Sequence, residues 1–222
     1  MPVQTDDTET DTPLLFGRVL DGKGGGRPIL WAEAKTWRKA APGEVLWLHL
    51  CRNRPGVQEW LESALEIPEP TAELLTSDET RPRAFREGNT LVATLRGINF
   101  NPGAEPEDMI SMQAWSDGDR LITLRRHPLQ TPREVLAQID RGSGPPDAGA
   151  TITLLAELLI GRMSQSIVDM NEVLDQLEET DPEEMAESML KQISMIRRNC
   201  LGLKRHMAPQ HEALEQISRD AP

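Results

Sequence analysis

The side chains best suited to chemistry in this chain are carboxylates gathered around a break between two helical segments. The break is Thr180-Asp181-Pro182, and the acids beside it are Asp175, Glu178, Glu179, Asp181, Glu183, Glu184 and Glu187. Carboxylate oxygens are ligands of hard divalent cations, and a dense acidic surface also attracts cations at long range. We therefore take Glu178, Glu179, Glu183 and Glu184 as a candidate weak cation site, with a solvated helix surface as the plainer alternative.

Soft metal ligands are few and poorly spaced. His206 and His211 could assist the carboxylate site from an adjacent copy of the chain, or could be exposed structural histidines. Cys200 and His206 are six residues apart and His206 and His211 five apart in the same helix pattern, whereas chelation from one helix needs a spacing of three or four. Neither pair shares a helix face. Cys200 lies on an apolar stripe, so we expect it in the core. His49 and Cys51 share one face of a strand, but their apolar neighbours predict a packed interior and not a zinc site.

A second candidate cation site is the loop that contains Glu105, Glu107 and Asp108, although Asp108 could simply cap the next element. Nothing indicates an enzyme: the four histidines are scattered, and no Ser/His/Asp or Cys/His motif is present. The turn from Gly22 to Gly26 is followed by Arg27 and not by the Ser or Thr of a phosphate loop. It is predicted to join two strands. We expect no cofactor to be required for folding.

Composition narrows the classes of partner. With 24 basic and 36 acidic residues among 222, the formal net charge is −12, which argues against a nucleic-acid binder. No run of 18 or more apolar residues occurs, so we expect no membrane span in this sequence. Residues 1–12 lack the features of a signal peptide and read as a disordered acidic tail.

The elements that must position these residues fall into two parts. Residues 13–142 are predicted to form an α/β unit, with strands expected at 14–20, 45–50, 83–87, 90–97, 109–115 and 120–126 and helices between and after them. In the last strand, Leu121 and Thr123 face one side and Ile122 and Leu124 the other. Residues 143–150 read as a Gly/Pro linker. Apolar stripes over 151–222 predict two helices packed as an antiparallel hairpin.

The most distinctive stretches are Asp78-Glu79-Thr80-Arg81-Pro82-Arg83 and Leu95-Arg96-Gly97-Ile98-Asn99-Phe100-Asn101-Pro102-Gly103. With Leu46-Trp47-Leu48-His49-Leu50 and Arg205-His206-Met207-Ala208-Pro209-Gln210, they resemble the cytoplasmic N-terminal domain of ZntB-like zinc transporters, a branch of the CorA family of divalent-cation transporters. The similarity spans nearly the whole chain.

This resemblance implies a mixed, roughly seven-stranded sheet with helices on both faces, followed by a long helical hairpin. It also implies a place on the cytoplasmic face of the inner membrane, where five copies form a funnel that gathers Zn²⁺ or Mg²⁺ and regulates a pore. The membrane helices of that family are not found in this sequence, so we expect a soluble piece that is monomeric or weakly associated by itself. The alternative is a stand-alone regulatory or scaffold domain that transports nothing.

Overall fold

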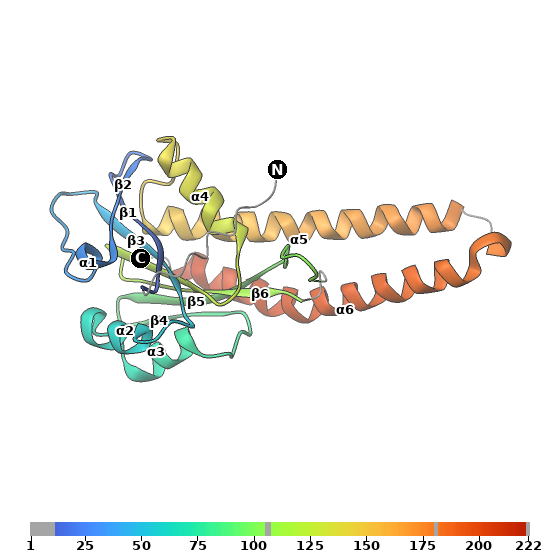
Figure 1. Ribbon diagram of the computed structural model, residues 1–222, viewed down its shortest axis with the longest axis horizontal. Helices are drawn as coiled ribbons and strands as arrows, with labels where there is room; N and C mark the ends of the chain where they lie inside the picture. Colours follow the sequence, from blue (N-terminus) through green and yellow to red (C-terminus); the bar gives the residue numbers. More distant parts are fainter. Residues whose placement is uncertain (1–11, 105–107, 180–181, 221–222) are drawn as a thin grey trace.

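A seven-stranded mixed sheet is the centre of the molecule (Figure 1). The computed structural model describes residues 12–104, 108–179 and 182–220, except for the side chains of 182–187 and 220. The expected acidic tail, 1–12, therefore lies outside the described residues apart from Thr12. The strands are β1 (Leu14–Leu20), β2 (Gly26–Pro28), β3 (Val45–Cys51), β4 (Arg83–Glu87), β5 (Thr90–Gly97), β6 (Ile110–Ser116) and β7 (Arg120–Arg125).

The strand order is β2-β1-β3-β7-β6-β5-β4, and only the central pair β3 and β7 is parallel. The other pairs are antiparallel, including the β4-β5-β6-β7 meander, whose four strands the sequence analysis expects. The glycine-rich turn joins β1 to β2, as expected for a strand-to-strand connection. Strand β2 is only three residues long and pairs with Arg18–Leu20, so it covers one half of the outer edge of β1.

Helices cover both faces of the sheet. On one face lie α1 (Trp31–Ala34), α2 (Val57–Leu65) and α3 (Glu69–Thr76), and on the other α4 (Gln130–Asp140), α5 (Ala148–Glu179) and the C-terminal part of α6 (Pro182–Asp220). Strand alternation separates the two cores: Trp47 packs toward α4 and α5, whereas Leu46 and Leu48 pack toward α2 and α3. The predicted fold class is confirmed. Helix α5 begins at Ala148, inside the segment 143–150 that the sequence analysis expects to be linker.

Helices α5 and α6 form the hairpin, whose arms extend well beyond the sheet (Figure 1). Where the arms leave the sheet, a small third core joins them to it, built from Ile98, Met109, Met163, Met170, Ile196 and Leu203. Cys200 is exposed, so the expectation that it lies in the core is wrong. The buried positions of α6 include the polar residues Asn199 and Gln210. The face of α6 that packs inward therefore includes Asn199 and not its neighbour Cys200, which the apolar pattern had selected.

Among the described residues, α5 is the one helix long and apolar enough to cross a membrane by length and composition. The absence of a long apolar run had argued against any such segment. The inward face of its first half, with Ile152, Leu155 and Leu159, is already buried against the sheet. The same apolar character is therefore what a core helix of this length requires.

Candidate functional site

The carboxylates predicted to bind a cation lie at the end of the hairpin that is far from the sheet. Glu178 and Glu179 are exposed in the last turn of α5, while the side chains of Glu183 and Glu184 lie outside the described part of the chain. His206 lies roughly 36 Å along α6 from Pro182, at about 1.5 Å per residue. One chain therefore does not bring the acids and the histidines together.

The outer half of α5 is acidic, whereas α6 is basic from residue 188 onward. Exposed acids recur along the outer half of α5 at Asp169, Glu172, Asp175 and Glu179, which at 100° per residue occupy roughly one third of the helix circumference. The only base in α5 is Arg162. From residue 188 onward α6 carries six bases (Lys191, Arg197, Arg198, Lys204, Arg205 and Arg219) and three acids (Glu212, Glu215 and Asp220). The acidic face of α5 is thus the surface of the hairpin best suited to attract cations.

His206 stands in basic surroundings. It is half-buried in a shallow pocket of about 480 Å³ that Asp108, Arg197, Arg198 and Arg205 also line. Burial, and then the nearby Arg96 and Arg205, lower its pKa from 6.5 to about 4. The imidazole is therefore neutral near pH 7, but the surrounding guanidinium groups oppose a metal cation there.

The other predicted ligands are dispersed. His211 is exposed, and its Nε2 lies 3.6 Å from Glu215 Oε1 one helical turn away. Glu105 and Glu107 lie outside the described residues. Within the described ranges, no group of three or more His, Cys, Asp or Glu side chains is placed so that it could hold a metal ion.

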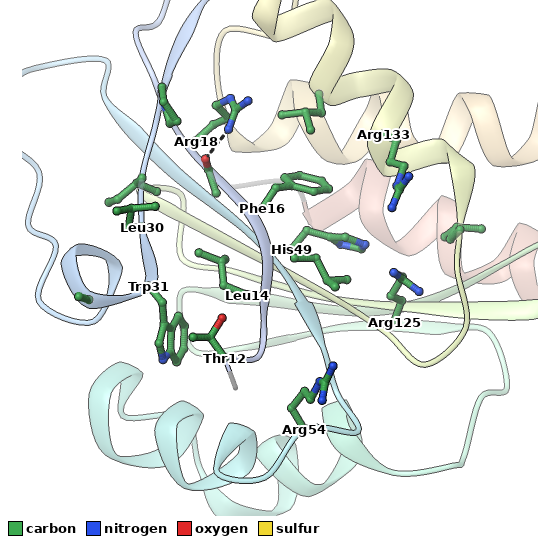
Figure 2. Close-up of a pocket in the computed structure, with 17 residues that line it drawn as sticks. Thr12, Leu14, Phe16, Arg18, Leu30, Trp31, His49, Arg54, Arg125 and Arg133 are labelled. Carbon is green, nitrogen blue, oxygen red and sulfur yellow. Dashed lines mark hydrogen bonds between the residues drawn. The ribbon is translucent and has the colours of Figure 1, made fainter. Parts of the chain in front are cut away.

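His49 is buried, as predicted, and Cys51 is only partly buried. The pKa of His49 falls from 6.5 to about 3, first because of burial and then because of Arg125 and Arg133. These three side chains line a cavity of about 830 Å³ between the sheet and α4 (Figure 2). Sequence reasoning missed the two arginines. The sequence indicates part of this arrangement, because Arg133 and Leu136 are three residues apart and so share one face of α4.

The distinctive motif residues tie the hairpin to the sheet. The backbone N–H of Arg96 donates to Gln210 Oε1 (2.7 Å), and Gln210 Nε2 donates to the Arg96 carbonyl (2.9 Å). The Arg96 guanidinium donates to the carbonyls of Thr80 (2.9 Å) and Met109 (2.6 Å). Gly97 lets Leu159 of α5 approach, since a Cβ there would lie 2.5 Å from Leu159 Cδ2. These residues hold the fold together and do not form a reaction centre.

The mixed seven-stranded sheet with its long helical hairpin matches the soluble domains of solved transporter structures. The structure superposes on the ZntB cytoplasmic domain of Vibrio parahaemolyticus with a TM-score of 0.78 at 24% identity, over 92% of this chain and 79% of that one. The sequence model described as "CorA-like Mg2+ transporter protein" matches residues 42–222. The chain belongs to this family of transporters.

Two relatives show which members it resembles. The divalent cation transporter CmaX of Pseudomonas aeruginosa is 37% identical over 208 residues, covering 93% of this chain and 62% of that protein. The zinc transport protein ZntB of Pectobacterium atrosepticum is 31% identical over 199 residues, covering 90% of this chain and 59% of that protein. The chain thus spans about three-fifths of the length of these relatives. The resemblance to the ZntB-like branch is confirmed.

Proposed function

We propose that this chain is the cytoplasmic domain of a divalent metal ion transporter of the inner membrane, with Zn²⁺ as the transported ion. In it, five copies would surround one pore, gather cations and regulate their passage. The observation that carries the proposal is the similarity to CmaX and ZntB along at least nine-tenths of the chain. Zinc is preferred over magnesium because several relatives are named as zinc transport proteins.

The acidic outer half of α5 supports the cation-gathering part of the proposal. Asp169, Glu172, Asp175 and Glu179 are exposed and lie along one side of a helix with a single base. Carboxylates spread along a helix hold no preformed tetrahedron, so each zinc ion would bind weakly and exchange rapidly. Weak binding is what a surface needs if it raises the local cation concentration without retaining the ion.

Transport by the full-length natural protein tests the main proposal. The protein would be reconstituted into vesicles loaded with a zinc-sensitive dye, with vesicles containing a magnesium-sensitive dye in parallel. We expect zinc entry that empty vesicles lack and that excess Mg²⁺ inhibits little. If the natural reading frame carried no membrane-spanning segments beyond this chain, the stand-alone regulatory or scaffold role would replace transport.

Calorimetric titration of the isolated chain with Zn²⁺ tests the cation site. We propose that Glu178, Glu179, Glu183 and Glu184 bind the ion, with His206 or His211 of an adjacent copy as additional ligands. Replacing the four glutamates with glutamine should weaken the isotherm. The matched control replaces Glu59, Glu66, Glu69 and Glu73, which are exposed on and around α2 and α3 and give the same change of charge.

If both variants bound Zn²⁺ equally more weakly than the wild type, the effect would be one of overall charge and not of a local site. An unchanged isotherm in the first variant would indicate that Zn²⁺ binds at Glu105, Glu107 and Asp108 instead.

A thermal melt in excess chelator tests the expectation that folding needs no metal. The cooperative transition should keep its midpoint, because two apolar cores already cover both faces of the sheet.

A further inference from the structure

The cavity between the sheet and α4 runs along an open strand edge (Figure 2). Strand β2 pairs only with Arg18–Leu20 of β1, and just beyond this pairing the Ile29 N–H donates to the Gly17 carbonyl (3.2 Å). Within the described chain, the segment 14–16 therefore has no strand neighbour on its outer side, and its residues line the cavity. An open strand edge presents backbone donors and acceptors with which an extended peptide segment can pair.

The imidazole of His49 also needs a partner in this cavity. His49 is only 1% exposed, and its Nε2 has no hydrogen-bond partner within the described residues. The Thr123 hydroxyl, 2.9 Å from Nδ1, can either donate or accept, so Nε2 is an acceptor in one tautomer and a donor in the other. A peptide group carries both an N–H and a C=O. A peptide segment can therefore satisfy Nε2 whichever tautomer is present.

Two arginines at the cavity have no acidic partner. Arg54 and Arg133 are exposed and line the cavity, and neither forms an ion pair within the described part of the chain. Arg18 and Arg125 line it too, but Arg18 is paired with Asp140 and Arg125 also has a partner, so neither enters the argument. The described lining residues include no Asp or Glu. An acidic segment would therefore meet two unpaired cations and no opposing carboxylate.

The rest of the lining is largely apolar and partly open to solvent. Leu30 is 77% exposed, more than any other large hydrophobic residue in the described ranges. Phe16, Leu129 and Leu136 add apolar surface from β1 and α4. An occupant with an apolar part would remove this surface from water.

The segment that precedes Thr12 matches these requirements. Thr12 lines the cavity, so residues 1–11 are joined to the chain at its rim. They include four acids and no base, and they begin with the apolar Met1-Pro2-Val3; the acids are Asp6, Asp7, Glu9 and Asp11. Eleven extended residues reach about 36 Å, which is ample to fold back over the cavity. A tethered segment also has an effective concentration in the millimolar range, so a weak intrinsic affinity is sufficient.

We propose that residues 1–11 occupy this cavity, with carboxylates against Arg54 and Arg133 and peptide groups bonded to His49 Nε2 and to the open edge of β1. Met1, Pro2 and Val3 would cover the apolar lining. The site lies on the sheet and not on the acidic hairpin, so the proposal does not depend on the cation site proposed above. The N-terminal segment would then be a bound part of the domain that another acidic peptide could displace.

Nuclear magnetic resonance of the full chain tests the proposal. A nitroxide label would be attached at Gln4→Cys, with Cys51→Ser and Cys200→Ser so that no other thiol reacts. In about 0.1 M salt we expect the label to broaden the amide signals of Leu30 and Leu136. Arg54→Gln with Arg133→Gln should reduce this broadening roughly three- to ten-fold, since each exposed ion pair contributes modestly to binding. Salt at about 1 M, which screens charges beyond about 3 Å, should act in the same direction.

Arg38→Gln with Arg141→Gln is the matched control, because both arginines are exposed, neither lines the cavity and the change of net charge is the same. It should leave the broadening unchanged. All variants would first be checked for a wild-type circular dichroism spectrum. The proposal is overturned by the absence of broadening at Leu30 and Leu136, or by equal reduction in the two double-arginine variants. Broadening that persists undiminished when a labelled chain is mixed with an isotope-labelled chain lacking the nitroxide would assign the cavity to the segment of a second copy, and would also overturn it.

Discussion

Folding lowers the pKa of both His49 and His206, and in both cases burial is the first cause and neighbouring arginines the second. Neutral imidazole is therefore the folded form of both residues near pH 7. In the unfolded chain each returns to an ordinary pKa near 6.5. Between the folded and unfolded values the unfolded state binds more protons, so the free energy of unfolding falls as the pH falls.

Replacing His49 should reduce this pH dependence. With a pKa of about 3 in the folded state and 6.5 unfolded, His49 should cost the native state about 2 kcal/mol between pH 7 and pH 5. His49→Gln removes that proton uptake. Between pH 7 and pH 5 the free energy of unfolding of the variant should therefore fall by about 2 kcal/mol less than that of the wild type. Urea unfolding at the two pH values measures the difference. Identical losses in the two proteins would show that His49 does not titrate as the structure requires.

How far the sequence predicts such residues depends on whether their neighbours are local. The two-residue spacing of His49 and Cys51 was enough to place both on one strand face and to predict a packed interior. It could not identify Arg125 and Arg133, because their proximity depends on the parallel pairing of β3 with β7 and on α4 lying above both strands. That arrangement comes from tertiary packing and leaves no mark in local spacing.

The contact between α5 and β5 depends on a glycine. A Cβ at Gly97 would lie 2.5 Å from Leu159 Cδ2 and 3.5 Å from Leu129 Cδ1. Gly97→Ala should therefore lower the free energy of unfolding by about 1–3 kcal/mol, as expected when a packed core is overfilled. Gly161→Ala is the matched control on α5, where a Cβ meets nothing within 4 Å. It should instead stabilise the helix by about 0.5–1 kcal/mol. If thermal melts showed the midpoint shifted in the same direction in both variants, this packing would be contradicted.

The side chain of Gln210 in α6 pairs with the backbone of β5 as a neighbouring strand would. Its side-chain amide makes both hydrogen bonds with the backbone of Arg96, just past the end of the pairing between β4 and β5. Gln210→Ala would leave a buried donor and a buried acceptor unpaired, so we expect a loss of about 2 kcal/mol in urea unfolding. Glu212→Ala, at an exposed position of the same helix, should change stability little. Comparable losses in the two variants would mean that helix content matters, and not the amide.

Element types were more predictable than element faces. Long alternating strands and long apolar stripes have a detectable period, and these are the elements that the sequence analysis finds. Strand β2 has three residues and no period, so its bounds were not predicted, although the turn that leads into it was. The inward face of α6 differs from the predicted one because the polar residues Asn199 and Gln210 occupy buried positions. A pattern built from apolar residues alone therefore selected Cys200, which is exposed.

At the scale of the whole molecule, the outward face of α6 governs self-association. It exposes Leu190, Ile193 and Leu201, which alone would favour contact between copies. Arg197 and Lys204 lie at helical spacing among them and are exposed too. Two copies that met through this face would bring like charges together while burying little apolar area.

We therefore expect the isolated chain to be monomeric or weakly associated at micromolar concentration in 0.1 M salt. Arg197→Gln with Lys204→Gln should strengthen association several-fold, because it removes the repulsion and keeps the apolar residues. Raising the salt concentration should act in the same direction, since the Debye length falls from about 10 Å at 0.1 M to about 3 Å at 1 M. Sedimentation velocity measures both. A stable pentamer of the unmodified chain would show that α6 itself assembles the five copies, and would make this basic face an interface between subunits.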